Sequence, residues 1–201
     1  MARPREFEMD TALANAMDVF WTFGYEETSL TQLLDGMSLS RGSLYKAFSD
    51  KRSLFFAVLN KYDEEAVSPA VKLLSDTKIS DGTKRIEILF GRILNGVKQG
   101  DRRGCLLCTA AAGSAPHDAE IATQVHRLFD KMRYGFETAI GQSIEFSNQP
   151  TKVKSNIVNL LMAQYVGLRV LVRSGAPIET LEQVATSISH ILTGQLSSAS
   201  R

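Results

Sequence analysis

Apolar residues recur every three or four positions along almost the whole chain, which is the spacing of one face of an α-helix. The spacing is clearest in three short segments near the N-terminus. Their apolar stripes consist of Met9, Leu13, Ala16, Met17 and Phe20, then Leu30, Leu33, Leu34 and Met37, then Leu44 and Phe48. Because no segment sustains the period-two alternation of a half-buried strand, the pattern predicts an all-α fold.

Turn and capping residues predict where these helices begin and end. Gly24 is a suitable end for the first helix, while Ser40 and Ser49 are placed to cap the helices that follow them. The helix after Ser49 is expected to run past Pro69, with a bend there. The later helices are separated by polar or glycine-rich breaks at 80–82, 100–104, 116–118, 147–150 and 175–177.

Three short amphipathic helices within the first 62 residues predict a helix-turn-helix between about Thr28 and Phe48. Leu30, Leu33 and Leu44 are placed to pack the second and third helices against the first. A plain three-helix packing unit with no role in nucleic-acid binding shows the same apolar pattern. The outer face of the third helix therefore decides between the two interpretations.

That outer face carries the residue types that a recognition helix needs. Short side chains near its start let the backbone approach base edges, and hydrogen-bond donors hold phosphates. Arg41 and Ser43 are the candidates for sequence preference, whereas Tyr45 and Lys46 suit phosphate oxygens. Gly42 costs helix stability at an exposed position, which suggests that the backbone closely approaches a phosphate.

The charge distribution supports a positive stripe on a chain whose formal net charge is only +1. Residues 6–36 contain seven acidic residues and no Lys or Arg, whereas residues 38–62 contain five basic residues and one acid. An ordinary solvated face gives the same count, so the charge alone is weak support. Lys51 could bind a phosphate together with the free N–H groups at the start of its helix. Arg3 and Arg5 form either an arm that reaches a minor groove or solvated charges.

Three runs in this region resemble the DNA-binding domain of the tetracycline-repressor (TetR) family of bacterial transcription regulators. They are GlyTyrGluGluThrSerLeu at 24–30, SerArgGlySerLeuTyrLysAlaPhe at 40–48 and AspLysArgSerLeuPhe at 50–55, within a match over about 7–62. One position departs from the family pattern, because Ser38 stands where the turn usually has glycine. A left-handed serine costs about 1 kcal/mol relative to glycine.

The resemblance implies a DNA-binding domain at 1–62 and a larger helical domain for ligand binding and dimerisation at 63–201. It also implies a homodimer on a pseudo-palindromic double-stranded operator, released when an unknown small-molecule inducer binds. The implied DNA-binding residues are Thr28, Ser29, Ser40, Arg41, Gly42, Ser43, Tyr45, Lys46 and Lys51.

The last two helices, predicted at 152–174 and 179–196, carry apolar stripes suited to helix packing. Ala163 and Gly167, four residues apart, would let another helix approach closely. In the TetR family two such helices from each subunit make a four-helix dimer interface, whereas packing within one chain is the alternative. The candidate interface residues are Leu160, Ala163, Gly167, Leu171, Leu181, Val184, Ile188 and Ile191.

Cys105 and Cys108 are the only cysteines. A helix places both thiols on one face, and the preceding arginines and a helix N-terminus favour a thiolate at Cys105. The surrounding segment is also similar to a stretch in the ligand domains of TetR-type regulators, including some that sense electrophiles or oxidants through that cysteine. The alternatives are two buried apolar thiols or, with His117, a zinc site that lacks a fourth ligand.

These patterns together predict a DNA-binding repressor released by a small-molecule or oxidative or electrophilic signal. The alternative within the family is a helical dimer that acts as a thiol-based sensor or partner protein without operator binding. A thiol oxidoreductase is disfavoured because its motif sits in a βαβ fold, and no phosphate loop or nucleophile elbow is present. We expect no enzymatic activity, cofactor or metal. We also expect a cytoplasmic location, since no apolar run approaches the ~20 residues that cross a bilayer.

Overall fold

The computed structural model describes residues 3–193, which are helical throughout apart from turns and loops, and no strand occurs in that range. Side chains are described from Met9 onward, so those of Arg3 and Arg5 lie outside the described part. The chain divides into two compact units. One comprises Met1–Ala66 with Leu106–Leu128, and the other Val67–Cys105 with Phe129–Arg201. The all-α prediction is confirmed.

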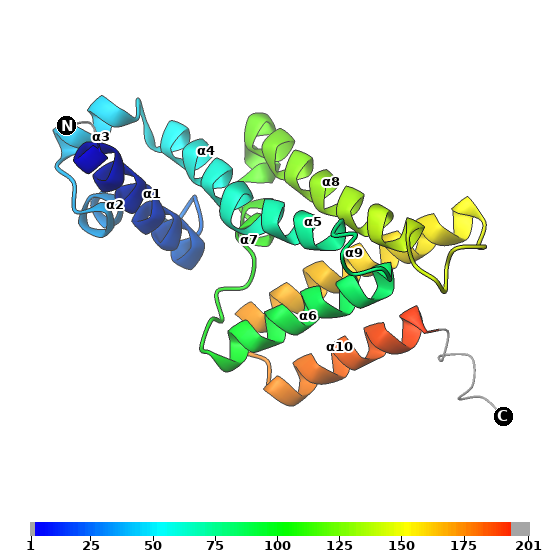
Figure 1. Ribbon diagram of the computed structural model, residues 1–201. Helices are drawn as coiled ribbons and strands as arrows, with labels where there is room; N and C mark the ends of the chain where they lie inside the picture. Colours follow the sequence, from blue (N-terminus) through cyan, green and yellow to red (C-terminus); the bar gives the residue numbers. More distant parts are fainter. Residues whose placement is uncertain (1–2, 194–201) are drawn as a thin grey trace. The chain divides into compact units, whose positions relative to one another are not determined.

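The first unit is built around the three N-terminal helices and the fourth helix, α4 (Figure 1). Its helices are α1 (Arg3–Phe23), α2 (Leu30–Met37), α3 (Arg41–Ala47), α4 (Lys51–Tyr62), α7 (Leu106–Ala112), the short η2 (Ala115–His117) and the first part of α8 (Ala119–Gly141). Helix α1 packs against α2, α4 and α7. Phe20 of α1 is fully buried, and its ring meets Phe55 of α4 edge-on with 4.9 Å between centroids.

Two of the three predicted helix boundaries in this unit hold. Gly24 ends α1 with a φ of +82°, and the Ser40 hydroxyl caps α3 by accepting the Ser43 N–H. Ser49 does not cap α4. Asp50 takes that role, because its extended backbone directs the carboxylate at the Ser53 N–H, 2.6 Å away. The Ser49 hydroxyl instead lies 2.7 Å from that of Ser53.

The predicted irregularity near Pro69 is a break in the helix type. Helix α4 ends at Tyr62, a π-helical turn (η1, Asp63–Val67) follows, and α5 (Ser68–Leu74) begins directly after it. Pro69 stands in the first turn of α5, directly after the π turn. The π turn thus lets the chain stay helical through the proline.

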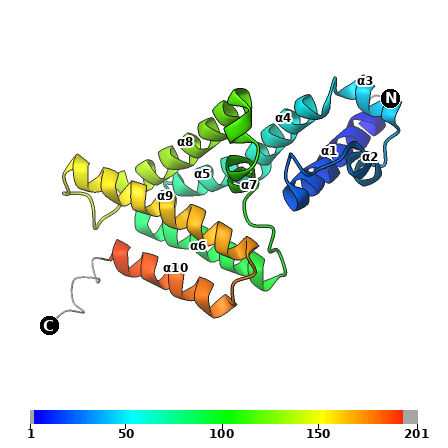
Figure 2. The same cartoon turned by 180° about the vertical axis from the view of Figure 1, so that it is seen from behind.

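The second unit packs α6 (Gly82–Lys98) along both α9 (Thr151–Arg173) and α10 (Ile178–Leu192), and the end of α5 against α6. Figures 1 and 2 show α6, α9 and α10 side by side from opposite directions. The rings of Phe90, Phe136 and Tyr165 meet at the centre of this unit, with centroids between 6.1 and 6.5 Å apart. Both ends of α9 and the start of α10 lie within one residue of the prediction, whereas α10 ends at Leu192, before the predicted residue 196.

Helix α9 has the predicted length but is more apolar than we expected from the sequence. Its 23 residues include an 18-residue window of mean hydropathy 1.3, which meets the length and composition of a membrane-spanning helix. Val158, Leu161 and Leu168 are buried, as in a core helix that packs within one unit. Only 33% of the window is buried, however, so α9 also presents an apolar face outward.

The division into units differs from the predicted domains. The first unit extends to Ala66 rather than residue 62. It also includes Leu106–Leu128, which we expected to belong to the second domain. Contact between α7 and α1 accounts for this return. Such a contact joins residues far apart in sequence, so helical periodicity could not reveal it.

Candidate nucleic-acid interface

Helix α2 is capped at both ends. At its start Ser29 and Gln32 form a capping box: the Ser29 N–H donates to Gln32 Oε1 at 2.8 Å, and the Gln32 N–H donates to Ser29 Oγ at 3.2 Å. At its end Ser38 adopts φ 54° and ψ 39°, and the Leu39 N–H donates to the Leu34 carbonyl at 3.1 Å. The left-handed serine predicted from the sequence is therefore confirmed. It is the only non-glycine residue with positive φ in the described chain.

Helix α3 has one buried residue, Leu44, and its other six side chains or backbone positions are exposed. Leu44 fixes the helix to the unit, and the Ser40 cap fixes its start, with Ser40 Oγ 3.0 Å from Ser43 Oγ. All the α3 residues predicted to contact DNA lie on the exposed side, together with Ser29 and Ser40 at the helix caps. They are Arg41, Gly42, Ser43, Tyr45 and Lys46.

The basic side chains in this region divide into outward and internal ones. Arg41 and Lys46 are exposed, and neither forms a hydrogen bond or ion pair with any described residue. Lys61 lies 2.7 Å from Asp10 and 2.9 Å from Glu65, so its charge is satisfied within the unit. Arg52 is paired as well. The basic count from the sequence thus overstates the charge available for DNA.

Lys51 has an internal role that the sequence did not show. Its ammonium lies 4.6 Å from the centre of the Tyr25 ring and donates to the Glu26 carbonyl at 3.4 Å. Burial lowers the pKa of Lys51, against the opposing effect of Glu26 and Glu27. Lys51 therefore holds the α1–α2 loop against the start of α4, whatever contact it also makes with a phosphate.

Thr28 does not lie on the candidate interface. Its side chain is only 2% exposed, and its hydroxyl donates to the Gly24 carbonyl at the end of α1. Thr28 closes the α1–α2 turn, so its side chain is not part of the exposed face, and its contact with DNA stays a prediction. The neighbouring Ser29 is exposed and remains a candidate.

Gly42 has no packing reason to be glycine. A Cβ built on it meets only Ser40 Oγ, at 4.0 Å, so the helix itself leaves room for a side chain. The absent side chain leaves the α3 backbone open to close approach from outside the helix. This observation fits the close approach expected from the sequence.

The candidate dimer residues divide between the exposed face and the core. On α9, Leu160 is 37% exposed, Ala163 is exposed, and a Cβ added to Gly167 meets nothing within 4 Å. Leu171, Val184 and Ile191 are half-buried. Leu181 and Ile188 are buried within the chain, which favours packing inside one subunit, and their role in an interface stays a prediction. Val170, 51% exposed on the same α9 face, extends the stripe.

Cys105 was predicted to be the more reactive of the two cysteines, but it is the less exposed one. Cys105 precedes α7 and is buried, whereas Cys108 lies within α7 and is half-exposed, and neither forms a disulfide. His117 is exposed. Among the residues whose side chains are described, no three His, Cys, Asp or Glu residues come together as a metal site.

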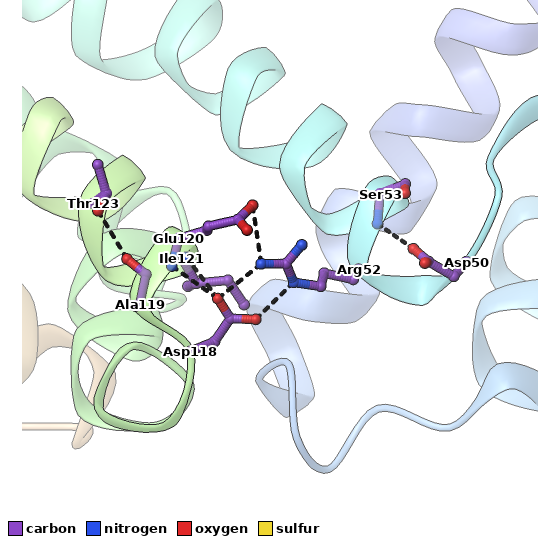
Figure 3. Close-up of polar contacts among 8 residues, drawn as sticks. All are labelled: Asp50, Arg52, Ser53, Asp118, Ala119, Glu120, Ile121 and Thr123. Carbon is purple, nitrogen blue, oxygen red and sulfur yellow. Dashed lines mark hydrogen bonds and ion pairs between the residues drawn. The ribbon is translucent and has the colours of Figure 1, made fainter.

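Arg52 and Asp118 form a contact that sequence analysis missed (Figure 3). The guanidinium of Arg52 on α4 pairs with the carboxylate of Asp118 before α8, with 2.7 Å between Nε and Oδ2. This pair and the helix N–H groups hold the pKa of Asp118 well below its usual range. The residues are 66 positions apart, and no local pattern connects them.

Comparisons with known proteins point to one family. Residues 12–58, which contain this helix-turn-helix, match the family described as "Bacterial regulatory proteins, tetR family". The HTH-type transcriptional repressor ComR of Escherichia coli (strain K12) is 28% identical over 91% of this chain and 88% of its own length.

Solved structures agree over nearly the whole chain. The TetR-family regulator CifR, with three cysteine substitutions and bound to 26-base-pair double-stranded operator DNA, is 25% identical. It has a TM-score of 0.78 and covers 90% of this chain and 94% of its own. The reduced form of E. coli NemR has a TM-score of 0.77 at 18% identity and covers 92% of this chain and 96% of its own, so it supports the fold.

Proposed function

The chain belongs to the TetR family of bacterial regulatory proteins, and from this premise we infer that it is a sequence-specific DNA-binding transcriptional regulator. The observation that carries this function is the outward face of α3. Arg41 and Lys46 project from a helix that is capped by Ser40 and fixed by Leu44, with no partner among the described residues. Such a face supplies phosphate contacts and base contacts from one rigid helix.

The regulator is proposed to act as a homodimeric repressor on a pseudo-palindromic operator. The exposed apolar stripe of α9 supports dimerisation, because Leu160, Ala163 and Val170 leave an apolar helix face in contact with water. Two recognition helices related by a twofold axis read two half-sites, which multiplies the specificity of one small domain. The repressor role follows the similarity to ComR.

The signal that releases the operator is proposed to act on residues 63–201, which follow the helix-turn-helix domain. A groove of about 370 Å³ between α6 and α10 supports a small-molecule signal, because its volume falls in the range of ligand sites. Phe90, Leu94 and Ile188 line it with apolar surface. The half-exposed Cys108 supports an oxidative or electrophilic signal instead.

Substitution of the cysteines separates these two signals. Operator binding by Cys105→Ser and Cys108→Ser is measured before and after treatment with peroxide or a quinone. Under the thiol signal the treatment releases the wild type, and at least one of the two variants stays bound. If both variants respond as the wild type does, the thiol signal is rejected.

A second candidate is a helical dimer that senses thiol-reactive compounds or serves a partner protein without operator binding. The position of Cys108 on α7 favours it, since this residue is only partly buried. The exposed Arg41 and Lys46 argue against it, because a protein without a nucleic-acid partner needs no such basic helix face.

Selection of bound duplexes from a random DNA library tests the proposed function. We expect enrichment of a pseudo-palindrome with half-sites about one helical turn apart or a multiple of it. A chain with both Arg41→Ala and Lys46→Ala serves as the control and should enrich nothing. Absence of enrichment by the wild type would reject DNA recognition, and enrichment of a single half-site would reject dimeric readout.

A further inference from the structure

Arg52 is held by contacts on three sides in the first turn of α4. Its Nε lies 2.7 Å from Asp118 Oδ2 and its Nη2 lies 3.0 Å from Asp118 Oδ1, a bidentate pair. Nη2 is also 3.1 Å from Glu120 Oε2, and the guanidinium carbon lies 5.1 Å from the centre of the Phe56 ring. Figure 3 shows the guanidinium between the two carboxylates. The positive charge is therefore satisfied within the unit.

The Asp118 carboxylate has a second task at the start of α8. It accepts the backbone N–H of Glu120 at 2.9 Å and that of Ile121 at 3.1 Å, which makes Asp118 the cap of this helix. One carboxylate thus joins the first turn of α4 to the first turn of α8 (Figure 3).

The start of α4 in turn sets where α3 ends. Only residues 48–50 connect the two helices, and Phe48 and Asp50 are in extended conformations. A connection of only three residues has little slack, so a shift of α4 at its start moves the recognition helix with it. Asp50 also locks this turn by accepting the Ser53 N–H.

We propose that Arg52 and Asp118 are positioning residues for operator recognition: their pair holds the start of α4 to the start of α8 and thereby sets the position of α3. This inference rests on the proposed function. The alternative is that Arg52, one of the five basic residues counted at 38–62, binds a phosphate directly. A guanidinium enclosed by Asp118 and Glu120 offers a phosphate little net charge.

Two substitutions break the pair while keeping the other contacts of each residue. Arg52→Met keeps an unbranched apolar stem beside Phe56, and Asp118→Asn keeps an oxygen that caps α8. Affinity is measured by fluorescence anisotropy for a duplex selected from the random library and for a scrambled duplex of the same length. Each single variant should bind the selected duplex about three- to thirtyfold more weakly, the range of a charge-assisted contact.

The double variant and the scrambled duplex distinguish positioning from phosphate contact. Because the two residues act as one unit, the double variant should bind no more weakly than either single variant. The affinity for the scrambled duplex should stay within about twofold, since positioning affects base contacts more than the general attraction to phosphates. Arg52→Lys keeps the charge but not the bidentate geometry, so it should recover only part of the loss.

Three results would overturn the inference. The first is that Arg52→Met weakens both duplexes while Asp118→Asn weakens neither, which is the pattern of a direct phosphate contact. The second is that either single variant binds the selected duplex as the wild type does, and the third is that Asp118→Asn binds it more tightly. Melting curves establish that each variant is folded at the temperature of measurement. If Arg52→Met is unfolded, Asp118→Asn and Arg52→Lys provide the test. If the wild type itself prefers no duplex, the proposed function has failed instead.

Discussion

Lys46 and Arg41 are the two basic side chains of α3 that remain unpaired among the described residues. Arg41 is the candidate for sequence preference, and Lys46 is the candidate for phosphate contact. Lys46 suits a phosphate, so Lys46→Ala should weaken binding to all DNA sequences alike. It should also lower the slope of log affinity against log salt by about one unit, because about one counterion fewer is released. Binding titrations between about 0.05 and 0.3 M salt measure this slope.

Lys78→Ala is a matched control, because Lys78 is an exposed lysine outside the helix-turn-helix. It should leave both the affinity and the slope unchanged. Unchanged operator affinity of Lys46→Ala at about 0.1 M salt would remove Lys46 from the interface.

Arg85 is a buried residue whose charge has no carboxylate partner in the contacts of the second unit. It is 1% exposed and donates to the carbonyls of Ile79 at 2.7 Å and Leu74 at 3.2 Å, and to the Gln142 side chain. The Leu74 carbonyl belongs to the last turn of α5, where the helix dipole favours a positive charge. Arg85 therefore ties α5, the following loop and the segment after α8 to α6.

Replacement of Arg85 by Met should destabilise the chain strongly, because the acceptors around it stay buried and lose their donor. We expect a loss of about 2–4 kcal/mol in the free energy of unfolding. Urea denaturation measures it, and Arg92→Met, at an exposed position of the same helix, should change stability little. A loss below about 0.5 kcal/mol for Arg85→Met would contradict the structural role of Arg85.

At the scale of the element, Gly42 sets stability against function within α3. Gly42→Ala should stabilise the helix by up to about 1 kcal/mol, because alanine is the better helix former and its Cβ finds open space. The same methyl group should weaken operator binding if the α3 backbone lies against a phosphate. Thermal melting and operator titration of one variant test both signs.

Ala47→Gly, at the other exposed end of α3, provides the reverse control for Gly42→Ala. It should lower the melting temperature, and it should leave the distance between the Gly42 backbone and the operator unchanged. A Gly42→Ala chain that is more stable and binds the operator as well as the wild type would show that close approach is not the reason for glycine.

Local signals explain why the helices of the first unit were predictable from the sequence. Gly24, Ser38 and Ser40 act through their own backbone or through residues three to five positions away, so their effect is visible in a short window. Ser49 and Asp50 show the limit of such signals, because both are good caps and only the backbone conformation selects Asp50.

The parts of the site that sequence did not predict depend on contacts over long separations. In the sequence Arg52 is only one of five basic residues at 38–62, and its partner Asp118 lies 66 positions later. Leu181 and Ile188 share the apolar spacing of the exposed stripe, and periodicity alone cannot tell which apolar face meets the core. Thr28 is a polar residue in a motif, yet its hydroxyl is used inside the turn.

At the scale of the whole molecule, the exposed face of α9 links helix packing to DNA recognition. Val170→Glu places a charge on the apolar stripe, where Val170 is 51% exposed and the folded chain itself loses little packing. We expect this variant to be a monomer with an unchanged fold, because a buried unpaired carboxylate would be costly in the interface. Its operator affinity should fall much more than its affinity for a single half-site.

Ile144→Glu is the matched control for the α9 face, since Ile144 is even more exposed, at 74%, and lies in the loop after α8. Sedimentation at a range of concentrations should find this control dimeric and Val170→Glu monomeric. A dimeric Val170→Glu chain would place the interface elsewhere, whereas a monomer with full operator affinity would separate dimerisation from recognition. Because the α9 stripe lies outside the helix-turn-helix, loss of operator binding by a folded monomer could come only from the loss of the paired recognition helix.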